Sequence, residues 1–177
     1  MVSRVREIFA SVVAEGFRAE TVHGASHEEI DRMAVEQGVS TVPASLREVL
    51  RLLGRDPALW FAGLVFGVHA VDAQVKQDAL ECLDEANEYA MRDPQNLLVV
   101  VDAGDSAYLM VDGTDLELPD PPLWLVTEDG TVQKRWVSIT AWFRDAADRV
   151  LQCKARLVTR RELGRPDLAR EAYFEWP

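Results

Sequence analysis

The chain has few cysteines and lacks the short motifs that mark many enzymes. Its 177 residues include two cysteines, Cys82 and Cys153, which both lie on segments with apolar periodicity. This usage suits buried, reduced thiols in the cytoplasm better than a disulfide framework. The glycines form neither G-x-G-x-x-G nor G-x-x-x-x-G-K, which excludes the usual phosphate-binding loops. No serine lies in a nucleophile-elbow context, and neither cysteine has a sequence neighbour that would lower its pKa.

Long hydrophobic runs are also missing. No stretch approaches the roughly 18–20 apolar residues that a membrane-spanning helix needs. The first residues include Arg4, Arg6 and Glu7 where a secretory signal would need an apolar segment. We therefore expect a cytoplasmic protein that does not associate with membranes.

Positive charge is scarce. The chain has 19 Lys and Arg against 30 Asp and Glu, which gives a formal net charge of −11. Such a charge repels phosphate backbones, so direct binding to nucleic acid is not expected. The same field would speed association with a basic protein. Solubility alone is the other interpretation of this charge, and composition does not decide between the two.

The first third of the chain is predicted to be helical. Apolar residues recur at helical spacing in three segments, residues 2–16, 26–38 and 43–54. Ser26 and Glu29 fit a capping box at the start of the second segment. Pro43 suits the first position of the third helix. Gly38 and Gly54 are suitable ends.

The middle of the chain carries one more predicted helix, at residues 73–92. Before it, the apolar segment 58–71 indicates a strand and a loop. Asp93-Pro94 is predicted to stop the helix. One helix face is apolar, with Val75, Ala79, Cys82, Leu83, Ala86 and Ala90. The remaining positions are rich in carboxylates, at Asp78, Glu81, Asp84, Glu85 and Glu88.

The apolar period then changes from 3.6 to 2, which indicates strands. Strands are predicted at 97–102 and 107–111, followed after a proline-rich linker by a hairpin of 124–127 and 131–137. Asp129-Gly130 between the last two runs is a strong hairpin signal. Ser138 can cap a closing helix, and residues 155–177 form an arginine-bearing tail, either a short helix or loosely ordered. Helices, then an antiparallel meander, then a closing helix predict a single α+β domain over residues 1–177.

Two segments together resemble a known family. The first carries Glu29, Ile30, Glu36, Gly38, Val42, Pro43, Leu46, Val49 and Leu50; the second carries Trp124, Gly130, Ser138, Trp142 and Phe143. In this order they resemble the SUKH superfamily of the Smi/Knr type, over a core of about residues 26–152. Residues 1–25 and 153–177 would then be N-terminal and C-terminal extensions of that core.

The resemblance implies a protein that binds other proteins and has no catalytic residues. Many bacterial relatives are similar to immunity proteins, whereas fungal relatives resemble regulators. We therefore expect a non-enzymatic domain, with no cofactor, that neutralises a basic cognate toxin by direct binding. The alternative is a regulatory or scaffolding module in a housekeeping complex, which would dock through its N-terminal helix and arginine tail.

Candidate partner-binding residues are crowded into one acidic stretch, with one tryptophan from elsewhere. They are Asp102, Asp105, Asp112, Asp115, Glu117, Asp120 and Trp60. The carboxylates could form a solvated rim, a surface for a basic partner or, least favoured, an acid–base site. They do not follow the calcium-loop pattern.

The other tryptophans and the histidines are weaker candidates. Periodicity places Trp124, Trp136 and Trp142 in the core, whereas Trp60 and Trp176 are less constrained. His23 and His27 have the spacing of a helical metal pair, but they flank a helix boundary. No metal site is predicted.

Overall fold

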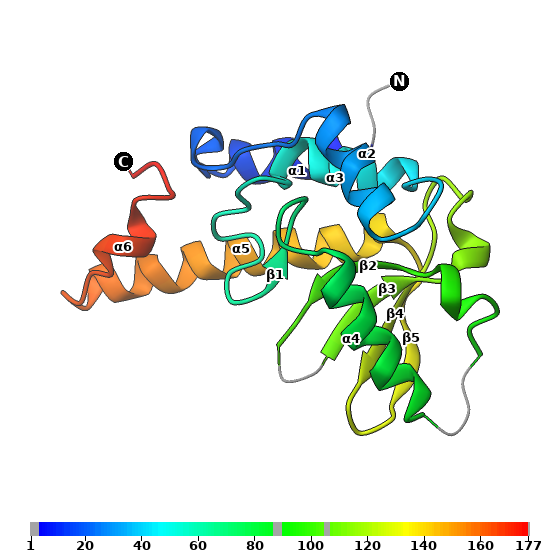
Figure 1. The fold of residues 1–177 in the computed structure, drawn as a ribbon. Coiled ribbons are helices and arrows are strands. Elements are labelled where there is room, and N and C mark those ends of the chain that lie inside the picture. The colour runs from blue at the N-terminus through cyan, green and yellow to red at the C-terminus, as the bar shows by residue number, and fades with distance from the viewer. Residues whose placement is uncertain (1–3, 87–89, 105–106, 177) are drawn as a thin grey trace.

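The protein is built around a five-stranded antiparallel sheet with helices on both faces (Figure 1). The computed structural model describes residues 4–86, 90–104 and 107–176. Strand order follows the sequence, β1-β2-β3-β4-β5, and each strand is antiparallel to its neighbour. The predicted α+β class, with helices first, then a meander and then a closing helix, is confirmed.

Three helices precede the sheet: α1 (Arg4–Ala14), α2 (His27–Glu36) and α3 (Ala44–Leu53). The capping box predicted for α2 is present. The hydroxyl of Ser26 accepts from the amide of Glu29 at 3.2 Å, and the carboxylate of Glu29 accepts from the amide of Ser26 at 2.8 Å. Pro43 lies one position earlier than predicted, because its extended backbone makes it the cap of α3.

The strands are β1 (Val65–Phe66), β2 (Leu98–Asp102), β3 (Ala107–Val111), β4 (Leu123–Thr127) and β5 (Val132–Trp136). The predicted β4–β5 hairpin is confirmed. The amide of Thr127 donates to the carbonyl of Thr131 at 3.0 Å, and Gly130 takes the positive φ of +81° that closes the turn. Of the segment 58–71, two residues form strand and the rest is mainly turns.

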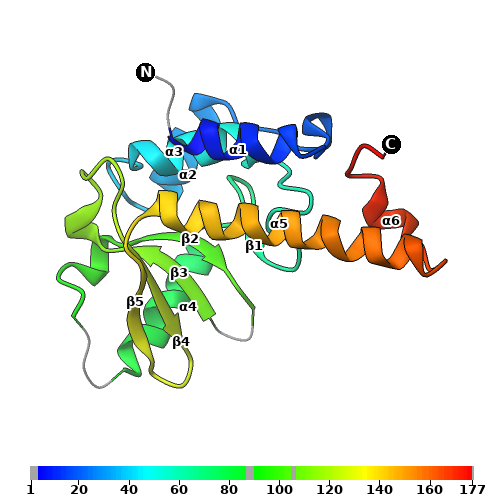
Figure 2. The same cartoon turned by 180° about the vertical axis from the view of Figure 1, so that it is seen from behind.

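Side chains on the two faces of the sheet enter two separate hydrophobic clusters. Leu98, Leu109 and Leu123 join the larger cluster with α1, α2, α3 and α5, whereas Val99 and Met110 join the smaller one under α4. This alternation follows from the two-residue period of a strand. The sheet therefore separates α4 from the other long helices, as Figures 1 and 2 show.

Helix α4 (Ala73–Asp84) is shorter than predicted. The prediction that Asp93-Pro94 stops it was wrong, because Pro94 begins a separate short helix, η2 (Pro94–Asn96). Ala90, expected on the apolar face, is exposed. Met91 packs into the cluster under α4, and a helix continued from Asp84 would carry it roughly 10 Å farther along the axis.

The closing helix α5 (Ile139–Glu162) is long, and a short helix α6 (Leu168–Glu171) follows it (Figure 2). Ser138 caps α5 as predicted, accepting from the amide of Ala141 at 3.0 Å. Residues 155–177 were expected to form a short helix or a loosely ordered tail; residues 155–162 instead continue α5, and α6 is the short helix that follows. Phe174 is buried, and its ring centroid lies 5.9 Å from that of Phe17. Residues outside 26–152 thus contribute to the larger cluster: Val5, Ile8, Val12, Phe17, Leu157 and Phe174.

No helix in the described part of the chain has the length and apolarity to cross a membrane.

Candidate functional site

The acidic stretch predicted to bind a partner is divided by the sheet. Asp102 ends β2 opposite Tyr108, near the start of β3, whereas Asp112 directly follows the end of β3. The intervening strand spans about 13 Å. Asp105 lies outside the described residues. The predicted residues therefore do not form one contiguous cluster.

Asp112 is a buried structural carboxylate, with 1% of its surface exposed. Burial by itself would raise its pKa. Backbone amides of Arg92, Asp93 and Thr114 donate to its two oxygens at 2.6, 3.0 and 3.1 Å, and the net effect is a lowered pKa. The hydrogen bonds of Asp112 therefore link residues 92–93, which precede η2, to the short helix η3 (Gly113–Asp115). The prediction that it faces a partner was wrong.

Asp115 and Asp120 also bind within the chain. Asp115 is buried, and its carboxylate forms an ion pair with the guanidinium of Arg92 at 3.1 Å. Asp120, which is half-buried, accepts from the amide of Thr140 in the first turn of α5 at 2.9 Å. Glu117 is exposed. Asp102 accepts from the amide of Gly104 at 2.8 Å. Local backbone and arginine donors thus occupy four of the six carboxylates that the sequence had grouped together.

Trp60 lies in the core rather than at the surface, with 3% of its area exposed. Its ring is stacked between Phe9 at 5.5 Å and Phe143 at 4.7 Å, with interplanar angles of 25° and 8°. A surface anchor for a partner needs an exposed ring, so this structure offers no such role to Trp60. Trp124 and Trp142 are buried as predicted, and Trp136 and Trp176 are half-buried.

A different set of carboxylates gathers at the end of α4. Glu81, Asp84 and Glu85 are exposed at its C-terminal turn, and Glu128 is exposed in the β4–β5 turn. That turn lies against the helix end, since a Cβ added at Gly130 would be 3.8 Å from Cα of Ala86. Both elements meet at the lower edge of the molecule in Figure 1. We call this set, with Asp78 and Asp102, the acidic surface.

Burial and the negative charge of the acidic surface together raise the pKa values of two neighbouring side chains, Cys82 and Tyr108. Burial raises the pKa of Cys82, and the charges of Glu85, Glu128, Asp78 and Glu81 raise it further. Burial also raises the pKa of Tyr108, with Asp102, Asp78 and Glu128 adding to the effect. Carboxylates from α4, from the β4–β5 turn and from the end of β2 therefore act on the same two buried side chains.

No cation neutralises the acidic surface within the described residues. None of its carboxylates forms an ion pair there; Asp78 and Glu81 accept from the side chains of Gln74 and Gln77. Its acids at the end of α4 also face the negative end of the helix dipole, where a carboxylate is destabilising. The last turn of α4 has no basic residue. We therefore expect this arrangement to lower the stability of the fold slightly.

The sequence contained a signal for this surface that the predictions did not use. Residues 77–91 contain no lysine or arginine. A solvated helix usually alternates charges that pair at i and i+4. In α4 the one lysine, Lys76, is buried and donates to the carbonyl of Gln37, so the charges on the exposed face are all negative. That absence distinguishes α4 from an ordinary polar helix face.

The histidines do not form a metal site in the described part of the chain. No group of three or more His, Cys, Asp or Glu side chains is placed there to hold a metal ion. The backbone of His23 forms a bridge with Asp56, and the ring of His69 lies 3.2 Å from a carboxylate oxygen of Glu29.

Comparison with known proteins provides no relative: no family model, curated protein or solved structure matches the chain. The resemblance to the SUKH superfamily therefore rests on the residue pattern and on the order of the elements.

Proposed function

We propose that this chain is a SUKH-type, non-enzymatic protein-binding domain that acts in the cytoplasm as an immunity protein. It neutralises a cognate toxin by direct binding. The observation that carries the proposal is the acidic surface, where exposed carboxylates from two adjoining elements have no cation partner among the described residues.

The charge of this surface favours a basic partner. Opposite charges across an interface raise the association rate and suppress wrong partners. Toxins that grip nucleic acid are basic at their binding sites, so an acidic inhibitor can cover such a site. The same surface repels nucleic acid itself, in line with the net charge of −11.

The alternative of a scaffolding module would place docking at α1 and at the arginine tail. Val5, Ile8 and Val12 of α1 are buried in the larger cluster, as are Leu157 and Phe174 near the other terminus. Deleting residues 156–177 would therefore damage the core as well as any docking element. Point substitutions at exposed residues give a cleaner test.

The experiment is affinity capture from native cells with three tagged proteins: the wild type, a variant of the acidic surface and a matched control. The surface variant carries Glu81→Lys, Glu85→Lys and Glu128→Lys. The control carries Glu7→Lys, Glu36→Lys and Glu162→Lys, which are exposed on α1, α2 and α5 and change the net charge equally.

We expect the wild type and the control to capture one basic, toxin-like protein at near one-to-one stoichiometry, and the surface variant to lose it. Higher salt should weaken the capture, because exposed charge pairs are screened. Capture of a housekeeping assembly would support the scaffolding alternative. Equal capture by both variants would remove the acidic surface from the proposal.

A further inference from the structure

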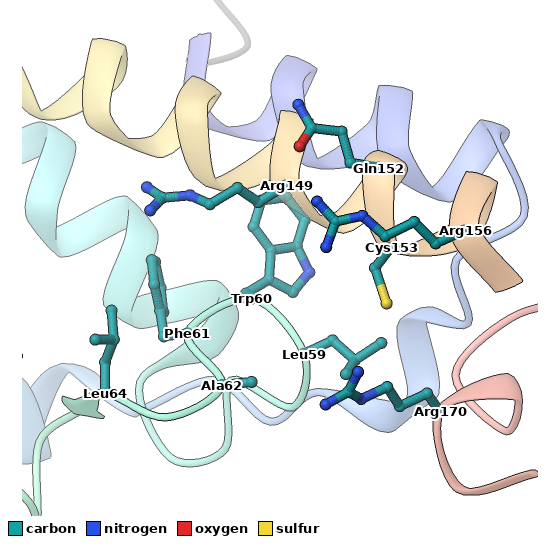
Figure 3. A pocket seen from close by; sticks show the side chains of 10 residues that line it. All are labelled: Leu59, Trp60, Phe61, Ala62, Leu64, Arg149, Gln152, Cys153, Arg156 and Arg170. Carbon is teal, nitrogen blue, oxygen red and sulfur yellow. The ribbon is translucent and has the colours of Figure 1, made fainter. Parts of the chain in front are cut away.

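A second candidate site lies at the other end of the molecule. A partly open pocket of about 370 Å³ is lined by residues of the segment 59–64, of α5 and of α6 (Figure 3). This volume is within the range of about 300–1,000 Å³ found for small-molecule pockets. Leu59, Phe61 and Leu64 supply apolar lining, and three arginines, Arg149, Arg156 and Arg170, contribute guanidinium groups.

Two of these arginines have no carboxylate partner in the described part of the chain. Among the residues that the structure describes, the side chains of Arg156 and Arg170 form no ion pair and no hydrogen bond. Nε of Arg149 donates to the carbonyl of Asp145 at 3.3 Å, which leaves its terminal nitrogens for other contacts.

Arg161, on the same helix, shows what a structural arginine does here. It pairs with Glu171 at 3.4 Å, and its guanidinium lies 4.4 Å from the centre of the Trp176 ring. The charge of Arg161 is thus used within the fold. Arg156 and Arg170 are exposed and line the cavity without such a partner in the described chain.

The buried nitrogen of Trp60 provides an independent observation. Among the described residues its Nε1 has no hydrogen-bond partner, and with 3% of its area exposed the residue has little access to water. In Figure 3 this nitrogen is on the side of the ring that faces Arg156 and Cys153. A buried donor without an acceptor costs free energy. A ligand oxygen entering beside Cys153 would supply the missing acceptor.

We propose that this pocket binds a small phosphorylated ligand. Its phosphate is held by Arg156 and Arg170, and its apolar or planar part packs against Leu59 and Phe61. Guanidinium groups bind phosphate oxygens through paired, charge-assisted hydrogen bonds, and two of them match the charge of a phosphate dianion. The net charge of −11 repels a long polyanion such as nucleic acid, so a small ligand with a single phosphate group fits better.

The test uses the full chain and four probes at constant ionic strength: inorganic phosphate, adenosine 5′-monophosphate, adenosine and succinate. Binding is followed by the shift of the Trp60 indole N–H resonance, assigned with Trp60→Phe, and by the thermal midpoint, which a ligand of the native state raises. The pocket variants are Arg156→Gln and Arg170→Gln. Arg160→Gln and Arg165→Gln are exposed controls outside the cavity with the same charge change.

We expect both phosphate-bearing probes to shift the Trp60 resonance, the nucleotide at lower concentration. Each pocket variant should weaken binding about tenfold or more, since a charged hydrogen bond is lost. The controls should stay within about twofold of the wild type. No response to either phosphate probe up to about 10 mM would overturn the proposal. Equal weakening in the controls, or equal affinity for succinate, would also contradict it.

Discussion

Two groups of carboxylates in this molecule differ in their surroundings: one is buried and hydrogen-bonded, and the other is exposed. Asp112 and Asp115 are crowded in sequence, yet they are buried and their oxygens accept from amides and an arginine. Glu81, Glu85 and Glu128 come from two elements, α4 and the β4–β5 turn, and they lie exposed around the end of α4 without cation partners in the described chain. Both groups are dense in the sequence, so density alone does not tell which carboxylates are exposed. What separates the groups is the supply of nearby donors.

The largest expected effect is at Asp112. Asp112→Ala removes the acceptor of three backbone amides, so we expect a loss of about 3 kcal/mol in the free energy of unfolding. Chemical denaturation measures it. Glu117→Ala, at an exposed carboxylate of the same stretch, should stay within about 0.5 kcal/mol of the wild type. A small effect at Asp112 would remove the distinction between the two groups.

Acid should destabilise the fold through Glu29, another carboxylate that is bonded within the chain. Arg55, Ser26 and His69 hold the pKa of Glu29 at about 2, below its ordinary 4.5. Because the folded pKa is lowered, the stabilisation is complete above pH 4.5 and is lost as pH falls toward about 2. Glu29→Gln should lower the thermal midpoint at pH 7 and flatten its decline over this window.

The matched control is Glu28→Gln, one residue earlier and paired across an exposed 3.3 Å contact with Arg32. It should leave the pH dependence of the thermal midpoint unchanged. If both variants behave alike, the capping box and its arginine do not set the acid sensitivity.

Substituting a carboxylate of the acidic surface should raise the stability of the fold, whereas substituting Asp112 or Glu29 lowers it. Because Glu81 and Glu85 lie at the negative end of the α4 dipole and repel each other, Glu85→Lys should stabilise the fold by about 0.5 kcal/mol. The gain should shrink in high salt. A loss of stability in chemical denaturation would mean that Glu85 has a structural role, and the acidic surface could not be described as a cost to the fold.

The smallest effect concerns Cys82. The charges of Glu85 and Glu128 add to burial in raising the pKa of its thiol. Glu85→Lys with Glu128→Lys should therefore lower the pKa of Cys82, measured by the pH dependence of thiol alkylation with mass-spectrometric separation from Cys153. An unchanged pKa would show that the two carboxylates do not act together on this site.

The elements that the sequence predicted correctly are those decided by local chemistry. Ser26 with Glu29, Asp129 with Gly130, and Ser138 each act within a few residues, and each is observed as expected. The end of α4 at Asp84 was missed because no glycine or proline follows it before Pro94 in the sequence. The role of Asp112 was missed because its donors at Arg92 and Asp93 lie about 20 residues away in sequence.

The arginine pocket could not be predicted for the same reason. Its lining joins the segment 59–64 to side chains almost a hundred residues later. Arginines in the tail were visible in the sequence, but nothing local separates Arg161, which is paired with Glu171, from Arg156. Only the packing of α6 against α5 makes that distinction.

The most direct test of the account is the association rate of the protein with its captured basic partner at low and physiological ionic strength. The variants are the Glu81, Glu85 and Glu128 lysine triple and its matched control at Glu7, Glu36 and Glu162. The account predicts an association rate at least about tenfold lower for the surface variant, with a flattened salt dependence, and no change for the control. Equal rates and equal salt dependence for the two variants would contradict it.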